Sequence, residues 1–312
     1  MNTKTQLKGI LILFACAFIW GSSFVAQSVG NESVEMFTFN GIRTVLGALV
    51  LMPVILFSDI IGLSKSKKTK ELIKSENKNA LIYGAMLGVV LCLASNLQQA
   101  AFEYTTSGKI AFITALYMFF VPIIGLFIKK RVPLLTWICV VVGFIGLVIL
   151  CMNPEDMTEI NKGDFLAFLC SIVYAVQILM VENFVSKTDG VKLSCVQFAV
   201  SGTITCILMF IFETPQIASI INAGIPILYA GVLSCGVAYT FQILGQKYTE
   251  ATIASLIMCL ESVFGVLCAA VVLVEIPKAH EIVGCIIMFA AIILSQLSDK
   301  FTAKKSSPTT EE

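Results

Sequence analysis

Residues 10–29 read ILILFACAFIWGSSFVAQSV and contain no Asp, Glu, Lys or Arg. A helix of this length is about 30 Å long, which matches the hydrocarbon core of a bilayer. Lys4 and Lys8 precede the run, as basic residues do in a secretory signal peptide. The run is longer than the apolar part of such a peptide and lacks a convincing cleavage site. We therefore expect it to be retained as the first membrane-spanning helix.

The rest of the chain has the composition of a membrane protein. Of its 312 residues, 57% are hydrophobic and 13% are charged, whereas a soluble domain carries about 25% charged residues. Apolar stretches predict spans at 9–29, 36–57, 80–102, 108–128, 133–152, 163–182, 192–212, 223–244, 251–274 and 279–297. Backbone groups in lipid must be paired within the segment, and the alternating pattern of a membrane barrel is absent. We expect an all-α integral membrane protein with ten transmembrane helices, surrounded by the lipid bilayer.

The composition also argues against several functions. The chain has a net charge of +1, a single His and no basic domain, which argues against nucleic-acid binding. Its 11 cysteines never form a Cys-x-x-Cys pair, so we expect neither a metal site nor a dithiol redox site. Gly108-Lys109 lacks the other residues of a nucleotide-binding P-loop. No catalytic residue, metal ligand or cofactor is predicted.

The basic residues predict the orientation in the membrane. With a cytoplasmic N-terminus, the ten spans place 17 of the 21 Lys and Arg residues in cytoplasmic segments. The outer segments then hold only Lys109, Lys162 and Lys278, and Arg43 lies inside a span. Cytoplasmic loops of membrane proteins carry such an excess of positive charge. We expect a multi-pass protein of the cytoplasmic membrane, with both termini cytoplasmic and a cytoplasmic tail at 301–312.

The sequence contains two similar halves, at residues 1–157 and 158–300. At an offset of 154 residues, Lys8-Gly9, Phe14, Cys16 and Trp20 align with Lys162-Gly163, Phe168, Cys170 and Tyr174. At an offset of 144, Tyr104-Thr105, Leu116, Phe120 and Pro133 align with Tyr248-Thr249, Leu260, Phe264 and Pro277. Five spans in each half give the halves opposite orientations. Many secondary transporters are such inverted repeats, with the substrate site near the midplane between the halves.

Short motifs along nearly the whole chain point to a family. They are Trp20-Gly21-Ser22-Ser23-Phe24, the segment from Thr105 to Pro122, and Leu260-Glu261-Ser262-Val263-Phe264-Gly265 followed by Glu275, Pro277 and Gly284. In this order they resemble the motifs of EamA-type transporters of the drug/metabolite transporter superfamily. One departure is Lys130-Arg131, where the first repeat of that family often has Gly-Glu. The resemblance implies two EamA-like five-helix repeats in a ten-helix carrier of metabolites, which often moves them out of the cytoplasm.

Candidate substrate-binding residues come in pairs spaced three residues apart, which places both members on one helix face. The pairs lie in matched spans of the two halves. Polar groups are costly in lipid, so these faces should point toward a central cavity, although hydrogen bonding between helices is the alternative for each residue. The candidates are Trp20 with Ser23, Asn96 with Gln99, Tyr174 with Gln177, Tyr239 with Gln242, and also Tyr117 and Glu261, whose neighbours at this spacing are Thr114 and Met258.

Two charged residues lie within spans. Glu261 is near the middle of the ninth span, where desolvation favours the neutral carboxyl group. It is a candidate to take up and release protons or to bind a substrate ammonium group. The alternative is a structural role, either in an ion pair with Arg43 or in a hydrogen bond to a neighbouring helix. Arg43 lies nearer the outer face of the second span, where snorkelling or a fixed ion pair is favoured over a substrate carboxylate.

Two classes of function remain. The first is a secondary transporter that exports amino acids or related small metabolites by alternating access, with proton exchange and facilitated diffusion equally open. The second is an intramembrane enzyme that acts on a lipid or lipid-linked substrate. Such an enzyme needs acids or His residues clustered near one membrane face, whereas the sequence offers Glu261 near the midplane and His280 at the outer entrance of a span. The transporter is therefore favoured, and an enzyme is not expected.

Overall fold

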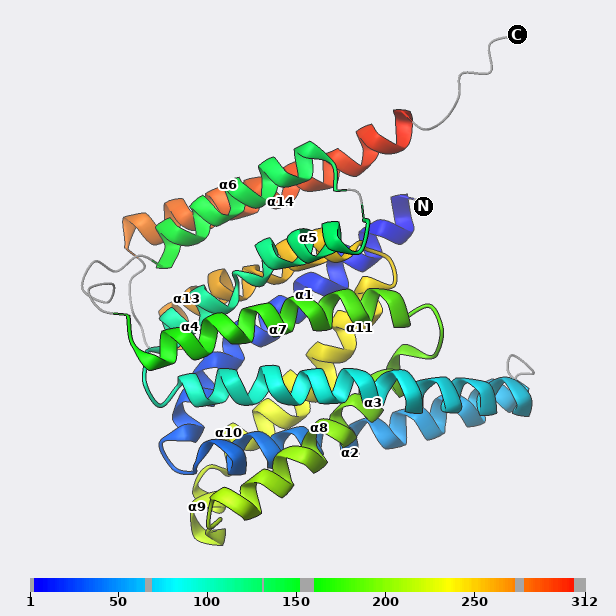
Figure 1. Ribbon diagram of the computed structural model, residues 1–312, viewed down its shortest axis with the longest axis vertical. Helices are drawn as coiled ribbons and strands as arrows, with labels where there is room; N and C mark the ends of the chain where they lie inside the picture. The colour runs from blue at the N-terminus through cyan, green and yellow to red at the C-terminus, as the bar shows by residue number, and fades with distance from the viewer. Residues whose placement is uncertain (1–2, 65–68, 131, 152–159, 273–277, 306–312) are drawn as a thin grey trace.

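The computed structural model describes residues 3–64, 69–130, 132–151, 160–272 and 278–305, and every regular element in these ranges is a helix (Figure 1). The first half contains α1 (Thr3–Asn31), α2 (Met36–Ser64), α3 (Lys70–Ala101), α4 (Ser107–Thr114), α5 (Tyr117–Phe127) and α6 (Leu134–Cys151). The second half contains α7 (Lys162–Phe184), α8 (Gly190–Phe212), α9 (Ile217–Asn222), α10 (Gly224–Leu228), the π-helix η1 (Tyr229–Tyr239), α11 (Thr240–Gln246), α12 (Ala251–Met258), α13 (Leu260–Val272) and α14 (Ala279–Lys305). The boundary expected between residues 157 and 158, Arg131, Glu275, Pro277 and tail residues 306–312 lie outside the described residues.

The helices have the length and surface of membrane spans. Within the described residues, nine segments are long and apolar enough to cross a bilayer, and the apolar part of α14, Ala279–Ser295, is shorter. Large apolar side chains lie on the outside of the bundle; Phe127, Leu134 and Ile225 are 84%, 77% and 82% exposed. An apolar surface of this kind fits contact with lipid. Each of the ten expected spans overlaps one of these segments, which confirms the all-helical membrane class.

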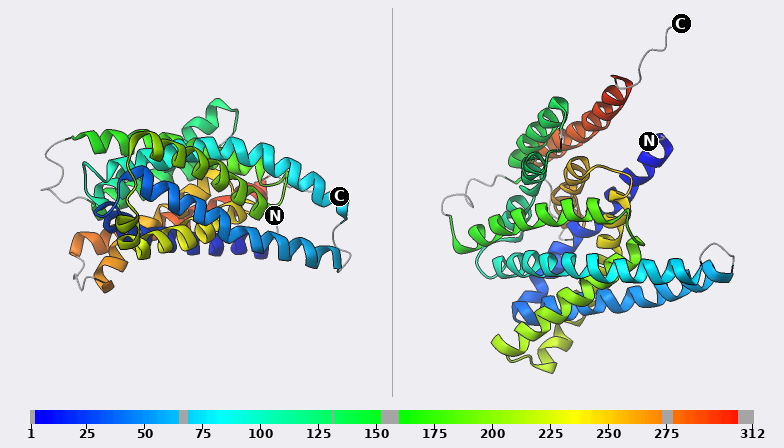
Figure 2. Two further views of the ribbon diagram at one scale, coloured as in Figure 1. Left: turned by 90° about the horizontal axis from the view of Figure 1, so that it is seen from below. Right: turned by 45° about the vertical axis from the view of Figure 1, so that its right-hand side comes forward.

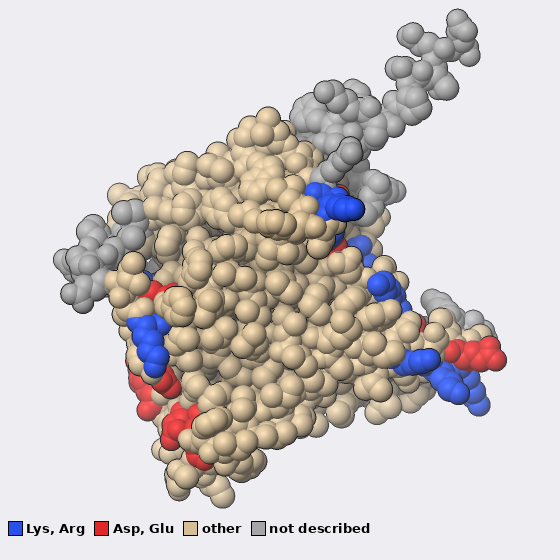
Figure 3. All heavy atoms as spheres, in the orientation of Figure 1, with Lys and Arg blue, Asp and Glu red and all other residues tan. Residues whose placement is uncertain are grey.

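The two ends of the bundle differ in charge. Helix α1 begins and α14 ends at the same end, on the right in Figure 1. Most Lys and Arg residues visible in Figure 3 lie at this end, and α2 and α3 project beyond the other helices there (Figures 1 and 2). The opposite end carries more Asp and Glu on the face shown. That the lysine-rich end is cytoplasmic stays a prediction.

The two halves pack against each other in matched pairs. Helix α2 packs along its counterpart α8, and α6 packs along its counterpart α14. Helix α3 packs on α7 and α8, just as η1 packs on α1 and α2. Helices α1 and α7, which begin the two halves, run in opposite directions in Figure 1. Exchanging the halves therefore reproduces the pattern of contacts, as an approximate two-fold axis between inverted halves requires.

Two of the expected spans are interrupted rather than continuous. In span 108–128, α4 ends at Thr114 and α5 begins at Tyr117; in span 251–274, α12 ends at Met258 and α13 begins at Leu260. The two breaks are 144 residues apart, which is the offset of the repeat in this region. At the first break the Leu116 amide donates to the carbonyl oxygen of Ile113, three residues back, at 3.2 Å. At equivalent positions the Met118 amide donates to the carbonyl oxygen of Ala115 at 3.1 Å, and the Ser262 amide donates to that of Cys259 at 3.2 Å. A tighter turn thus interrupts the α-helix at the same place in both halves.

A third span, expected at 223–244, is assembled from α10, η1 and α11. The central part, Tyr229–Tyr239, is a π-helix, whose turns are wider than those of an α-helix. Gly231 within it lies against α2, since a Cβ at this glycine would be 3.0 Å from the carbonyl oxygen of Arg43. The π-helix thus lies directly beside the α2 segment that carries the buried arginine.

Gly21 brings α1 against α13. A Cβ at Gly21 would lie 2.5 Å from the carbonyl oxygen of Glu261 and 2.8 Å from the amide nitrogen of Gly265. These distances are too short for any side chain larger than hydrogen. The glycine therefore fixes the separation of two helices that both carry candidate site residues.

Candidate functional site

A cavity lies between the two halves, near the breaks in spans four and nine. The space between its walls, including the part that opens to solvent, is about 490 Å³, and about 40 Å³ of it admits the centre of a water molecule. The lining residues are Trp20, Phe24, Gln27, Arg43, Gln98, Thr114, Tyr117, Tyr174, Ile178, Ser234, Tyr239, Gln242 and Glu261. Both halves contribute, and the free space is narrow. Only a small molecule fits without movement of the walls.

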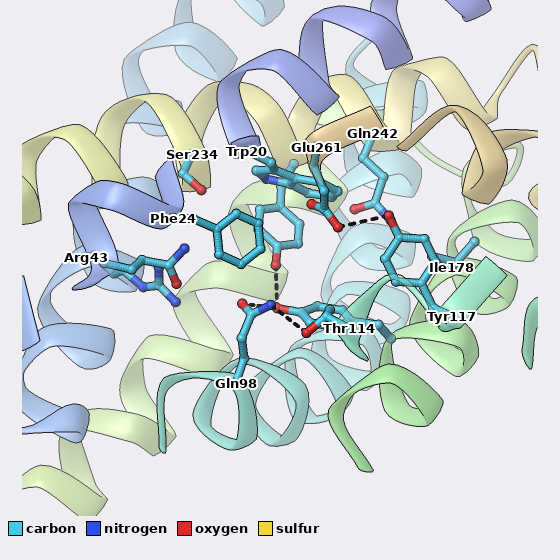
Figure 4. Close-up of a pocket in the computed structure, with 13 residues that line it drawn as sticks. Trp20, Phe24, Arg43, Gln98, Thr114, Tyr117, Ile178, Ser234, Gln242 and Glu261 are labelled. Atoms are coloured by element: carbon cyan, nitrogen blue, oxygen red, sulfur yellow. Dashed lines mark hydrogen bonds between the residues drawn. The ribbon is translucent and has the colours of Figure 1, made fainter. Parts of the chain in front are cut away.

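The two charged residues of the cavity lie apart. Figure 4 shows Arg43 on one side of Phe24, and Glu261 with Tyr117 and Gln242 on the other. Neither Arg43 nor Glu261 forms an ion pair with any residue that the structure describes. Of the two structural alternatives for Glu261, the ion pair with Arg43 is therefore not seen, whereas a hydrogen bond to a neighbouring helix is present, from Tyr117 of α5. The cavity instead has a positive side and a carboxyl side.

Glu261 meets its own repeat counterpart. The Tyr117 hydroxyl donates a hydrogen bond to Glu261 Oε1 at 3.1 Å, and the two residues are 144 positions apart. Beside them the Cys259 thiol donates to the carbonyl oxygen of Ala115 at 3.4 Å, again between residues 144 apart. Contacts between equivalent residues occur where a two-fold axis passes. Glu261, a buried residue that is 4% exposed, therefore has its carboxyl group close to the axis that relates the halves.

Arg43 is held by neutral partners. Its Nε donates to Asn40 Oδ1 at 2.9 Å, one helical turn earlier, and its guanidinium carbon lies 5.4 Å from the centre of the Phe39 ring. The Asn40 amide nitrogen donates in turn to Asn96 Oδ1 on α3 at 2.7 Å. Helix α2 thus places Arg43 in the cavity, and α3 fixes the amide that holds it.

Tyrosines and glutamines form the wall between the charged residues. The hydroxyls of Tyr174 and Tyr239 share a hydrogen bond of 2.9 Å, and the Tyr174 hydroxyl also donates to Gln98 Oε1 at 3.4 Å. Trp20 packs edge-on against Tyr239 with ring centres 4.6 Å apart. Among the lining residues, Trp20 Nε1, Gln27 Oε1 and Gln242 Oε1 are buried without a described hydrogen-bond partner. These atoms give a polar molecule in the cavity further groups to bond.

The structure brings together six of the ten candidates predicted from sequence. Trp20, Tyr117, Tyr174, Tyr239, Gln242 and Glu261 line the cavity. The other four are not among its lining residues, and they lie in contacts between helices or in the core. Asn96 donates to Thr205 at 3.0 Å, Gln99 donates to Asn31 at 3.1 Å, Gln177 accepts from Gln242 at 2.9 Å, and Ser23 is fully buried.

Sequence reasoning left seven lining residues out of the candidate set: Phe24, Gln27, Arg43, Gln98, Thr114, Ile178 and Ser234. The repeat itself carries a signal for some of them. Gln98 precedes Gln242 by 144 residues, and Phe24 precedes Ile178 by 154, as Trp20 precedes Tyr174. Gln242 was a candidate, and the residue 144 positions before it is Gln98. The repeat offset therefore points to Gln98 on the cavity face of α3, rather than to Asn96 or Gln99.

Comparisons with known proteins agree with this architecture. The model of the EamA-like transporter family matches twice, at residues 7–152 and 161–297. An uncharacterized transporter of Archaeoglobus fulgidus is 25% identical over 94% of this chain and 87% of its own length. The uncharacterized transporter YoaV of Bacillus subtilis is 25% identical over 93% of this chain and 97% of its own length. A solved crystal structure superposes with a TM-score of 0.72 at 13% identity, covering 96% of this chain and 99% of that one, and supports the fold alone.

Proposed function

The chain belongs to the EamA-like transporter family, and on that premise we propose that it is a secondary transporter that exports amino acids or related small metabolites by alternating access. Membership makes it a multi-pass membrane transporter and not an enzyme. The family does not define the substrate. The nature of the cargo, its direction and its mode of movement are therefore argued from the cavity.

The observation that carries the proposal is the position of the cavity between two inverted halves. A site that both halves line is reached from one membrane face or the other according to how the halves are packed. The walls combine aromatic rings, amides and two opposite charges, which suits a small amphipathic molecule. Amino acids have this character. No nucleotide-binding motif accompanies the cavity in the sequence, so a gradient supplies the driving force.

Counterflow into proteoliposomes tests the proposal. Vesicles that contain the purified protein are loaded with an unlabelled pool of amino acids and related metabolites, and uptake of labelled members is followed. We expect labelled cargo to accumulate transiently in protein-containing vesicles and not in empty ones. If no member of the pool exchanges while the protein remains folded, the proposed cargo class is wrong.

A Glu261→Gln variant, assayed at two pH values, tests whether the carboxyl group exchanges a proton during transport. If the variant keeps counterflow and loses only its pH dependence, Glu261 takes part in proton coupling. Glu32→Gln is the matched control, since Glu32 is exposed at the opposite end of the bundle from the lysines. It removes the same charge and should leave both rate and pH dependence unchanged. Export is followed in intact cells as release of the same cargo into the medium.

A further inference from the structure

We propose that Arg43 is the carboxylate subsite of the cavity and that the cargo is a zwitterion with one free carboxylate and one ammonium group. This inference rests on the proposed function and deepens it, since it names the group that the cargo must carry. It differs from the sequence interpretation, in which snorkelling or a fixed ion pair was favoured for Arg43. The structure argues against both of those roles.

Most of the hydrogen-bond donors of Arg43 have no acceptor among the described residues. The side chain is 5% exposed and lines the cavity. Within the described residues its only hydrogen bond runs from Nε to Asn40, and no carboxylate lies within 4.0 Å of it. The four N–H groups of the two terminal nitrogens therefore remain for another acceptor. Because a buried cation is strongly unfavourable without a partner, an anion bound in the cavity fits this arrangement.

The positive charge of Arg43 is explained neither by a neighbouring acid nor by a requirement of the fold. Glu213, the acid that contacts α2, already accepts hydrogen bonds from the amides of Phe37 and Thr38, each at 2.7 Å, and caps that helix. The repeat counterpart of Arg43, 154 residues later in α8, is Gln197, which is neutral and fully buried. A neutral side chain thus suffices at this position of the fold. The positive charge of Arg43 is specific to the cavity.

The neighbours of Arg43 orient it for a planar acceptor. The Asn40 amide nitrogen is bonded to Asn96 Oδ1 at 2.7 Å and to Ser95 Oγ at 3.1 Å, so its carbonyl oxygen is left for Arg43 Nε. With Nε held by Asn40, the two terminal nitrogens of this cavity-lining residue have no hydrogen bond to any residue that the structure describes. Two parallel N–H groups match the two oxygens of a carboxylate, which arginine commonly binds in this bidentate way.

The charges of the cavity indicate that the cargo carries an ammonium group in addition to its carboxylate. Arg43 and Glu261 are the charged residues among its lining residues, and they lie on opposite sides of Phe24 (Figure 4). A carboxylate at Arg43 leaves the cargo's ammonium group to Glu261, while Trp20, Phe24 and Tyr239 contact its apolar part. A phosphate dianion would require a second cation, which the lining does not supply. An α-amino acid satisfies both charges.

The first test measures binding by the wild-type protein. The unfolding temperature of the purified protein in detergent is recorded with a pool of the standard L-amino acids and with the same pool as carboxamides. A ligand that binds the folded state raises this temperature. The carboxamides keep the ammonium group and side chain but lose the carboxylate charge. We expect the acids to raise the unfolding temperature and the amides to leave it unchanged.

The second test measures transport by variants. In counterflow with the labelled amino acids, Arg43→Gln should lose at least about tenfold in initial rate, because charge-assisted hydrogen bonds are lost. Arg43→Lys should retain an intermediate rate, since it keeps the charge without the bidentate geometry. Gln197→Met is the matched control at the equivalent position of the other half, and it should stay within about twofold of wild type.

The outcomes separate the subsite from the proposed function. If the wild type is stabilised equally by acids and amides, or if folded Arg43→Gln transports amino acids like wild type, the subsite is overturned while transport stands. If the wild type neither binds nor exchanges any amino acid or amide, the proposed cargo fails and the subsite fails with it. The binding test needs no variant, so it decides the matter even if Arg43→Gln does not fold.

Discussion

The polar groups around the cavity differ in how firmly the fold holds them. Asn40 and Asn96 are bonded to each other and to α8 through Thr205, and their repeat counterparts Ser194 and Thr240 are bonded in the same way at 2.9 Å. This hydrogen bond recurs in both halves because it joins equivalent helices. Arg43 and Glu261 have no such equivalents. The repeated bonds are therefore structural, and the charges that are not repeated are the residues on which function should depend.

Tyr117→Phe should impair transport far more than folding. The substitution keeps the ring and removes the hydroxyl that donates to Glu261 at 3.1 Å. A hydrogen bond to a carboxyl group in this setting contributes about 1–3 kcal/mol, so we expect a roughly tenfold lower counterflow rate. Tyr229→Phe is the control, because its hydroxyl shares a hydrogen bond of 2.6 Å with Ser22 and does not line the cavity. Equal rates for the two variants would contradict the role given to Tyr117.

Glu250 lies in the turn between α11 and α12, and its carboxyl group should make the stability of the protein depend on pH. Burial and the neighbouring Glu182 raise the pKa of the Glu250 carboxyl above its ordinary value of 4.5, and Lys130 partly offsets this. The folded state therefore binds the proton more tightly than the unfolded state, so stability falls as the pH rises above 4.5. Glu250→Gln should remove this part of the decline. Unfolding temperatures in detergent between pH 4.5 and about 7 measure it, and a variant curve parallel to wild type would contradict the prediction.

At the scale of helices, hydropathy predicts where spans lie but not how they are built. The ten spans can be predicted from apolar runs, because any segment that crosses lipid must be apolar and must pair its own backbone groups. The breaks at Thr114 and Met258 could not be predicted in this way, because the flanking residues are equally apolar. The π-helix at Tyr229–Tyr239 has no local sequence mark either. The breaks and the π-helix depend on packing between the halves, and the sequence of a single apolar run carries no information about that packing.

The cavity face of each helix was harder to predict than the helix itself. In α3, the residues Asn96, Gln98 and Gln99 are all polar, and spacing within one helix cannot tell which of them faces the cavity. The pairing rule selected Asn96 and Gln99, whereas Gln98 is the residue that lines the cavity. In α1 a cavity-facing residue could be predicted, since Trp20 is the one large amphipathic side chain in the apolar part of that helix, and it lines the cavity. Long-range pairing with the second half was the missing information.

Gly21→Ala should disturb the contact between α1 and α13. The added Cβ would lie 2.5 Å from the Glu261 carbonyl oxygen, so the helices must separate. Overpacking of this kind typically costs about 1–3 kcal/mol, and we expect a lower unfolding temperature together with reduced transport. Gly265→Ala, on the facing helix, is the control: its Cβ would be an ordinary 3.7 Å from the Gly21 carbonyl oxygen. If both variants behave alike, the close approach at Gly21 is not what sets the helix separation.

At the scale of the whole molecule, ion pairs join the halves at both ends. Near the end opposite the lysines, Lys109 pairs with Asp164 at 2.9 Å, and at the lysine-rich end Lys130 pairs with Glu182. Both pairs connect the region of α4 and α5 to α7. Helix α7 is thus tied along its length to helices of the other half.

Orientation in the membrane is tested by labelling. Single cysteines at Ser186 and Glu103, both exposed and at opposite ends of the bundle, are treated with a membrane-impermeant thiol reagent in intact cells. We expect Glu103→Cys to react and Ser186→Cys to react only after the cells are opened, because the lysine-rich end should be cytoplasmic. The native cysteines are buried or half-buried, so unmodified protein gives the background. The reverse pattern would place both termini outside.

The unequal residues at equivalent positions have an energetic consequence for a carrier of this construction. If the two inverted halves were identical, the empty protein would be isoenergetic facing either side, because one state would be the image of the other. Any resting preference must therefore arise where the halves differ, and the pairs Arg43 with Gln197 and Tyr117 with Glu261 are such positions. In a carrier of this construction, a substitution at either position changes the charge of the cavity and the energy difference between the two states together.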